Sequence, residues 1–244
     1  MSERIEALPW DSDFFELSIG KVDLDGATDA DLIAIDAEAR DRGFDCVYGR
    51  LDATADSSNV GVRAQSHGHL LVEVAILMSR GAEPYEGIPT QSISRIATED
   101  DIDAVHAVLC DIAPWSRYGA DPHFGVAAAE KMFRAWVERA IRDDDRMIAV
   151  AEDEDGFTGV STNVMVGPTG VPCVDFMVVN KPGKGVSGAL LQALVDWAPA
   201  GPLDAGPCAA RNLAVLRFLE RYDFKMSQST YLFHWWKEGA RYGG

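Results

Sequence analysis

The chain has 244 residues, of which 47% are hydrophobic and 25% charged, and its formal net charge is -17. This length allows one large domain or two small ones, and the apolar content is sufficient for a buried core. Nucleic acids and anionic membrane surfaces are polyanions that this acidic chain would repel, so we expect neither nucleic acid nor a membrane among its partners.

The cysteines and the N-terminus indicate the compartment. The four cysteines are scattered, without a CxxC pair or a metal-ligand spacing, at positions Cys46, Cys110, Cys173 and Cys208. Reduced thiols in a cytoplasmic protein without a metal are the simplest interpretation. The N-terminus lacks the apolar region of a signal peptide, and no apolar run is long enough to cross a membrane.

Residues 1–85 have the pattern of a small α/β unit. Alternating or continuous apolar runs predict strands at residues 17–22, 46–51 and 70–78. Helical spacing predicts helices at residues 29–42, capped by Asp29 or Thr28, and 57–67. We interpret residues 10–15 as core packing at the start of this unit. Residues 81–90 combine Gly, Pro and acidic side chains and predict a linker, which divides the chain into domains at 1–88 and 89–244.

From residue 92 the predicted order is β, α, α, β, β, β, α, β, α, β. The predicted strands lie at residues 92–97, 147–151, 157–165, 174–179, near 203 and at 230–236. The predicted helices lie at residues 98–110, 126–142, 186–197 and 210–222. Three consecutive strands joined by short turns, followed by a crossover through a helix, predict a mixed sheet rather than a parallel one.

A glycine-rich loop is the most informative segment. The run Asn180-Lys-Pro-Gly-Lys-Gly-Val-Ser-Gly-Ala-Leu-Leu191 leaves an apolar strand and opens an amphipathic helix. Glycines allow the backbone to approach a phosphate, while the first N–H groups and the dipole of the helix attract its charge. The sequence therefore predicts a ligand that carries phosphate.

Two segments resemble the GNAT (GCN5-related) N-acetyltransferases. Residues 183–191 are similar to the pyrophosphate loop of that family, and residues 212–224 are similar to its Asn-x-x-Ala-x-x-x-Tyr helix. The resemblance implies an α/β (α+β) fold, with a mixed, mostly antiparallel sheet flanked by helices. It also implies transfer of an acetyl group from acetyl-CoA to the primary amine of a small molecule, by direct attack in a ternary complex.

A narrower resemblance concerns the N-terminal unit. The run Leu8-Pro-Trp-Asp-Ser-Asp-Phe-Phe15, followed by Ile19-Gly-Lys-Val22, resembles the start of the dTDP-fucosamine acetyltransferases. Residues 115–118 and 133–138 are similar to their substrate-side helices. This likeness implies that the acceptor amine belongs to a nucleotide-linked amino sugar.

The chain departs from the GNAT pattern at two functional positions. Pro182 or Asn180 stands where the loop usually has Arg or Gln, so Lys181 or Lys184 must supply the cation. Leu219 stands where the family has the Tyr that protonates the leaving thiolate. The usual general acid is therefore missing.

The resemblance assigns the acetyl-CoA contacts. The backbone of Met177, Val178 and Val179 would pair with pantetheine, and one of their N–H groups would polarise the thioester carbonyl. The pyrophosphate would be held by the loop and the start of the helix, which comprise Gly183, Lys184, Gly185, Val186, Ser187 and Gly188. Asn212 would contact the pantetheine arm, and it would equally serve as a helix N-cap.

Acid–base candidates come from the residues themselves. Asp175 lies in the apolar strand before the loop, where partial desolvation would raise its pKa toward neutrality, and it is our candidate base. A solvent-facing strand position is the alternative. Tyr222 is the candidate substitute acid, although a packed core tyrosine fits its position as well. We interpret His234 as structural, and His67 and His69 as turn residues rather than metal ligands.

Acceptor-site candidates lie in the loosely patterned segment of residues 113–122. Arg117 could grip a phosphate of the acceptor in bidentate fashion, flanked by Trp115 and Tyr118, and a purely structural loop is the alternative. A non-catalytic acyl-CoA-binding or regulatory protein is the second interpretation of the whole chain, and a homodimer remains an option for its assembly. A nucleotide-binding protein of another fold ranks last, because the loop lacks the Gly-Lys-Ser/Thr ending of a Walker motif.

Overall fold

The computed structural model describes residues 3–54, 56–83, 92–154, 156–181, 184–198 and 201–243. It forms two compact units, each built from separate chain segments. The first unit comprises Met1–Ala75, Pro114–Ala129 and Gln228–Gly244, and the second comprises Ile76–Ala113 and Glu130–Ser227. Among the α-helices and strands, residues of both units occur in β4 (Leu70–Arg80), α6 (Gly125–Arg142) and β10 (Lys225–Trp236). Most of the predicted linker lies outside the described residues, so the domain division at 88 and 89 stays a prediction.

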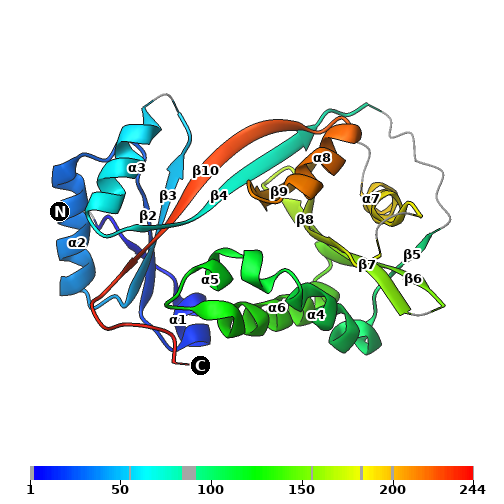
Figure 1. Cartoon of the computed structure of the whole chain (residues 1–244), viewed down its shortest axis with the longest axis horizontal. Helices are drawn as coiled ribbons and strands as arrows, with labels where there is room; N and C mark the ends of the chain where they lie inside the picture. The colour runs from blue at the N-terminus through cyan, green and yellow to red at the C-terminus, as the bar shows by residue number, and fades with distance from the viewer. Residues whose placement is uncertain are drawn as a thin grey trace. The chain divides into compact units, whose positions relative to one another are not determined.

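The first unit is built on four strands in the order β1-β2-β3-β10, of which β2, β3 and β10 are labelled in Figure 1. Its other strands are β1 (Glu6–Ala7), β2 (Ile19–Asp23) and β3 (Cys46–Asp52). Strands β2 and β3 are parallel, whereas β1 and β10 run antiparallel to their partners. The helices of this unit are α1 (Pro9–Phe15), α2 (Asp29–Asp41), α3 (Ser57–Ser66) and α5 (Arg117–Ala120). Helix α2 begins at Thr28, which caps it as predicted in a reciprocal capping box with Asp31.

Helix α1 corrects the interpretation of residues 10–15. This segment is a short helix with Pro9 in its first turn, where the missing N–H of proline costs nothing. Only Phe15 is buried in the core, while the Trp10 side chain is 49% exposed and stacks on Phe14 with ring centroids 5.1 Å apart. The aromatic pattern alone did not show which of these rings faces solvent.

A buried carboxylate organises the first unit. Asp121 is fully buried. Its Oδ2 accepts hydrogen bonds from His234 Nδ1 at 2.6 Å and Trp236 Nε1 at 2.8 Å, and its Oδ1 accepts one from the backbone N–H of His123 at 2.8 Å. Burial opposes ionisation of Asp121, but these hydrogen bonds outweigh it and lower its pKa to about 2. The structural interpretation of His234 is thereby confirmed.

His69 directly follows the turn at residues 67–68, and its ring is buried, with only 1% of the residue exposed. Neither ring nitrogen finds a hydrogen-bond partner among the described residues. Burial lowers the pKa of His69 to about 4, as burial does for His234. Both imidazoles are therefore neutral in the folded protein at neutral pH.

We expect these two histidines to make the protein less stable in acid. Between their ordinary pKa of 6.5 and the folded value of about 4, the unfolded chain binds protons that the folded chain does not. The free energy of unfolding should therefore fall by about 1 kcal/mol per histidine for each pH unit lowered in this window. Urea denaturation at pH 7, 6 and 5 measures the slope of the free energy of unfolding against pH. The variant His69→Leu should lose the part of this slope that His69 contributes. An unchanged slope in His69→Leu would contradict the assignment.

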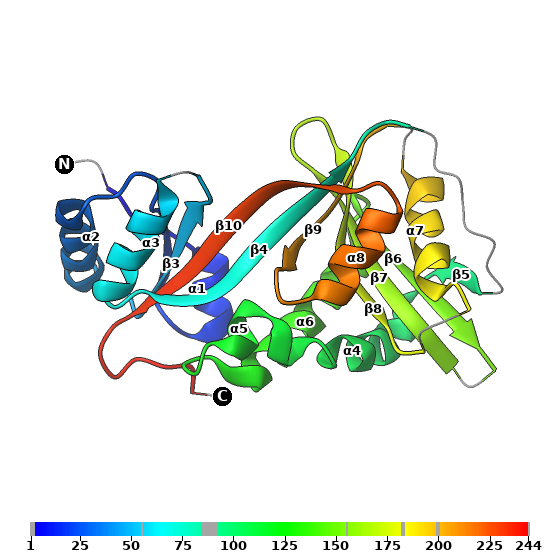
Figure 2. The ribbon, with the colours of Figure 1, turned by 45° about the horizontal axis from the view of Figure 1, so that its top comes forward.

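The second unit contains the strand order β9-β8-β7-β6-β5 (Figure 2). These strands are β5 (Ile93–Ile96), β6 (Arg146–Asp153), β7 (Gly156–Val166), β8 (Val171–Val179) and β9 (Leu203–Ala209). Strands β5 to β8 are joined antiparallel, and β8 and β9 are parallel. The helices are α4 (Ile102–Cys110), α7 (Val186–Trp197), α8 (Leu213–Arg221) and most of α6. A mixed, mostly antiparallel sheet flanked by helices is confirmed.

Helix α7 packs closely on the sheet because β7 carries a glycine at the contact. A Cβ atom at Gly159 would lie 2.7 Å from Val186 Cγ1 and 3.2 Å from Leu190 Cδ1. Val186 and Leu190 instead join a core with Met147, Ala149 and Ala151 of β6. Helix α7 is thus packed against the sheet from its first residue, Val186.

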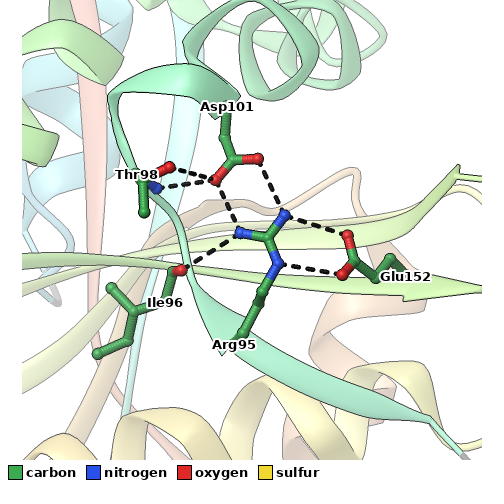
Figure 3. Close-up of polar contacts among 5 residues, drawn as sticks. All are labelled: Arg95, Ile96, Thr98, Asp101 and Glu152. Atoms are coloured by element: carbon green, nitrogen blue, oxygen red, sulfur yellow. Dashed lines mark hydrogen bonds and ion pairs between the residues drawn. The ribbon is translucent and has the colours of Figure 1, made fainter.

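Strand β5 is a short edge strand, which a charged network ties to its neighbours (Figure 3). The Arg95 guanidinium donates to both carboxylate oxygens of Asp101 at 2.7 and 2.9 Å, and to those of Glu152 at 3.0 and 3.1 Å. Asp101 also accepts from the N–H of Thr98 and closes a capping box ahead of α4.

Across the described ranges, no helix is long and apolar enough to span a bilayer.

Candidate functional site

Strands β8 and β9 share only a short parallel ladder. Their register joins Cys173 to Asp204 and Val174 to Ala205, and it does not continue toward Val179. Along the opposite edge, β8 remains paired with β7 as far as Val179. Alternate residues of a strand direct their backbone groups to opposite edges, so part of the Met177–Val179 backbone is left available to an extended ligand.

Asp175 occupies a β-bulge at the point where this ladder stops. Thr162 pairs with Phe176 and Asn163 pairs with Val174, which leaves Asp175 as the extra residue of β8. A bulge redirects a side chain out of the regular alternation and is frequent beside active sites. The sequence identified Asp175 but not the bulge, because a bulge depends on the register with the partner strand.

The surroundings of Asp175 raise its basicity. Burial raises the pKa of Asp175 to about 6, and Arg146 Nη1, 3.9 Å from Asp175 Oδ2, partly opposes this shift. The carboxylate lines a cavity of about 10 Å³, the space of roughly one water molecule. The other lining residues are Leu109, Trp136, Val137, Ala140, Arg146, Thr162 and Phe176. The predicted upward pKa shift is confirmed, and a group with this pKa can accept a proton at neutral pH.

The glycine loop turns through two left-handed residues. Lys184 has φ 53° and Gly185 has φ 76°, and Gly185 is the N-cap of α7. The first helical bond runs from the N–H of Ala189 to the carbonyl of Gly185. The N–H groups of Val186, Ser187 and Gly188 therefore precede the intrahelical ladder and can bind an anion. Gly183 lies outside the described residues.

The two candidate loop cations contact an acidic residue that the sequence did not single out. Lys181 Nζ lies 3.0 Å from Asp153 Oδ1, and Lys184 Nζ lies 3.8 Å from Asp153 Oδ2. Asp153 ends β6, and its pairing with the loop depends on the fold of the sheet. A phosphate bound by this loop would compete with Asp153 for both lysines.

On the expectation from the resemblance that this loop binds the pyrophosphate of acetyl-CoA, replacing Asp153 with Asn should strengthen that binding. Removal of a competing, partly exposed ion pair is worth about 0.2–1 kcal/mol, or roughly a 1.5- to 5-fold lower Kd. Isothermal titration calorimetry with acetyl-CoA measures the change. Glu154→Gln is the matched control, since it removes the same charge from the neighbouring exposed residue and should alter Kd far less. Equal effects of the two variants would show that only overall charge matters.

The residues on α8 have clear structural surroundings. Asn212 caps this helix by accepting the N–H of Val215 at 3.3 Å, as one of its two predicted roles requires. Tyr222 follows the helix, is 8% exposed and packs on Phe218 with ring centroids 4.8 Å apart. The pantetheine contact of Asn212 and the acid role of Tyr222 stay predictions.

The three acceptor-site candidates belong to the first unit. Trp115 is 55% exposed and Tyr118 is 2% exposed. The Arg117 guanidinium lies 4.8 Å from the ring centroids of both Tyr118 and Tyr48, and its Nη2 donates to Tyr118 Oη at 2.7 Å. The sequence missed Tyr48, whose alternating strand gave no reason to place it beside Arg117. Within the described parts of the chain, no three His, Cys, Asp or Glu side chains are grouped to hold a metal.

Comparisons with known proteins give a family and a fold. Residues 93–225 match the family model described as an acetyltransferase (GNAT) domain. A comparison with curated protein sequences found no match.

Three solved structures are similar to the chain. A functionally unknown conserved protein from Staphylococcus epidermidis is 12% identical, with a TM-score of 0.68 over 97% of this chain and 93% of that one. A GCN5-related N-acetyltransferase from Sphaerobacter thermophilus is 16% identical, with a TM-score of 0.56 over 83% of this chain and 65% of that one. A GCN5-related N-acetyltransferase from Kribbella flavida is 12% identical, with a TM-score of 0.54 over 89% of this chain and 80% of that one. At these identities the likeness concerns the fold.

Proposed function

Because the chain belongs to the GNAT acetyltransferase family, by a match over residues 93–225, we propose that it transfers an acetyl group from acetyl-CoA to the primary amine of a small molecule. The observation that carries this proposal is the position of Asp175. A carboxyl group with a pKa of about 6 lies in a bulge where β8 parts from β9, on the strand that leads into the glycine loop.

The proposed reaction is a direct attack. The amine lone pair forms a bond to the thioester carbonyl carbon, and the carbonyl oxygen takes up negative charge. A backbone N–H of Met177, Val178 or Val179 would donate to this oxygen. Asp175 would take the amine proton, directly or through one water molecule. The carbon–sulfur bond then breaks, and the thiolate leaves.

The missing tyrosine is compatible with activity. Leu219 is 2% exposed and cannot donate a proton. One proton donor is worth about 10²–10⁴-fold in rate, so a protein that relies on Tyr222 or on water would be slower without being inactive. Lys181, Lys184 and the first N–H groups of α7 would bind the pyrophosphate.

We further propose a nucleotide-linked amino sugar as the acceptor. Support comes from the resemblance of residues 8–15 to dTDP-fucosamine acetyltransferases and from Arg117, whose planar fork suits a phosphate. Thiol release from acetyl-CoA, measured with sugar-nucleotide amines, amino acids and polyamines, tests this. We expect turnover with the sugar-nucleotide amines, and turnover restricted to another class would reject this acceptor.

A non-catalytic acyl-CoA-binding protein is the second candidate, favoured by Leu219 and by the missing loop arginine. It predicts acetyl-CoA binding in calorimetry without thiol release for any amine in the panel. Failure to bind acetyl-CoA would reject both candidates.

A further inference from the structure

The first unit contains a pocket of about 500 Å³ that belongs to no part of the proposed acetyl-CoA site. Small-molecule sites commonly measure about 300–1,000 Å³. All its lining residues lie in the first unit, and they are Arg4, Glu6, Leu8, Asp11, Lys21, Val22, Asp23, Tyr48, Gly49, Arg50, Arg117, Leu232 and Phe233. The lining contains four cations and three carboxylates.

Three of the four cations already have carboxylate partners. The salt bridges join Lys21 to Glu6 at 3.1 Å, Arg50 to Asp52 at 2.8 Å and Arg4 to Asp31 at 3.1 Å. These pairs are partly exposed, and each neutralises one charge at the pocket.

Arg117 differs from the other three. No carboxylate among the described residues lies within salt-bridge distance of its guanidinium, whose hydrogen bond goes to the Tyr118 hydroxyl. The flanking rings of Tyr48 and Tyr118 fix its plane by cation–π contact. A planar cation held in this way keeps most of its N–H donors for a ligand, with little entropy left to lose on binding.

Tyr48 provides a second, independent observation. Its side chain lines the pocket and is only 6% exposed. Its hydroxyl is buried and finds no hydrogen-bond partner among the described residues. An unsatisfied buried hydroxyl costs about 1–3 kcal/mol, and an oxygen atom bound beside Arg117 would offer it an acceptor.

The remaining lining restricts the ligand further. Leu8, Val22 and Leu232 give the pocket an apolar part, which an inorganic ion would leave uncovered. Burial raises the pKa of Asp11, against the opposing charge of Arg117. The pocket thus combines one oriented cation, one unsatisfied hydroxyl and apolar walls.

We propose that this pocket binds a small organic molecule that carries a carboxylate or phosphate group, with the oxyanion on Arg117 and Tyr48 and the carbon skeleton against the apolar walls. This proposal gives Arg117 a ligand of its own in place of the acceptor phosphate considered above, and it does not depend on which amine is acetylated.

Calorimetry with three probes of similar shape tests the proposal. Benzoate offers a carboxylate, phenyl phosphate offers a phosphate, and benzyl alcohol is the neutral control. At least one anion should bind the full chain at least 10-fold more tightly than benzyl alcohol, and the stronger of the two identifies the oxyanion. Equal binding of all three would overturn the proposal.

Variants locate the binding. Arg117→Gln should lower the affinity for the anion about 10- to 100-fold, which corresponds to the loss of one charge-assisted hydrogen bond. The Kd of acetyl-CoA should stay unchanged. Arg50→Gln removes the same charge from a side chain that is already paired with a carboxylate, so it should lower the affinity for the anion less than 3-fold. Undiminished binding in Arg117→Gln, or equal losses in both variants, would reject the assignment.

Tyr48→Phe keeps the test decisive if Arg117→Gln folds poorly. It removes only the unsatisfied hydroxyl, so thermal stability should not fall, and anion binding should weaken several-fold. Unchanged anion affinity in a folded Tyr48→Phe would contradict the role of this hydroxyl. The anion titration should be repeated with excess coenzyme A, and the anion affinity should not change if the two ligands bind at different sites. Failure of the protein to bind coenzyme A would count against the proposed function and not against this pocket.

Discussion

Replacing Asp175 with Asn should lower the rate of acetyl transfer by about 10²–10⁴-fold, the usual contribution of a general base. The shape of the side chain is kept while its ability to accept a proton is lost. In the unaltered protein, kcat/KM should rise as the pH increases through the Asp175 pKa of about 6 and then level off. This rise should be absent in Asp175→Asn. The pH profile of thiol release measures both effects.

The same replacement should stabilise the fold at neutral pH. Because the folded pKa of Asp175 lies above its ordinary value of 3.8, the folded chain binds the proton more tightly, and stability is lost as the pH rises from about 4 to 6. Its side chain is 33% exposed, so we expect a gain of only about 1 kcal/mol in Asp175→Asn. Activity that falls while stability rises is typical of a functional carboxylate.

Asp196→Asn is the control for charge, because Asp196 is an exposed residue of α7. Its activity, pH profile and acetyl-CoA affinity should match those of the unaltered protein. Retention of more than a third of the activity in Asp175→Asn, with the rise near pH 6 intact, would show that another group takes the proton.

Replacing Asp121 with Ala should lower the free energy of unfolding by about 3–5 kcal/mol, the cost of removing one partner from a buried charged network. The loss would leave the His234 and Trp236 ring N–H groups and the His123 backbone N–H without an acceptor. Each unsatisfied buried donor is expensive. Chemical denaturation followed by tryptophan fluorescence measures the change, since Trp236 lies at the network.

Asp121→Asn is the graded comparison. Its amide oxygen can accept one of these hydrogen bonds, so we expect a smaller loss of about 1–3 kcal/mol. Asp45→Ala provides a control, because it removes a carboxylate that is partly exposed and accepts the backbone N–H of Ser18 at 2.9 Å. A loss below 1 kcal/mol for Asp121→Ala would mean that water replaces the carboxylate.

The second unit was largely predictable because its determinants are local. Apolar alternation defined β6 to β8, the glycines marked the start of α7, and their order predicted a mixed sheet. Asp175 was identifiable because a carboxylate inside an apolar run is unusual. The bulge that directs it, and the contact of Asp153 with both loop lysines, depend on strand register and on loop closure.

Long-range packing explains the residues that were missed in the first unit. Trp10 is half exposed although it was predicted to pack in the core, and the His69 ring is buried although nothing in the sequence pattern indicated its burial. Tyr48 and Arg117 meet although almost 70 residues separate them in the sequence. Burial of a polar ring depends on which helix covers it, and neither composition nor periodicity encodes that partner.

The pairing of β3 with β10 has a consequence for the order of events during synthesis. Asp52 pairs with Thr230, and Cys46 pairs with Trp236, so this edge of β3 has no strand beside it until the ribosome has made residues 230–236. Most of the second unit comes from residues that emerge earlier. The segment that holds β3, although translated before the second unit, would therefore complete its fold after it, and it exposes an unpaired strand edge, open to association with other chains, until β10 has been made.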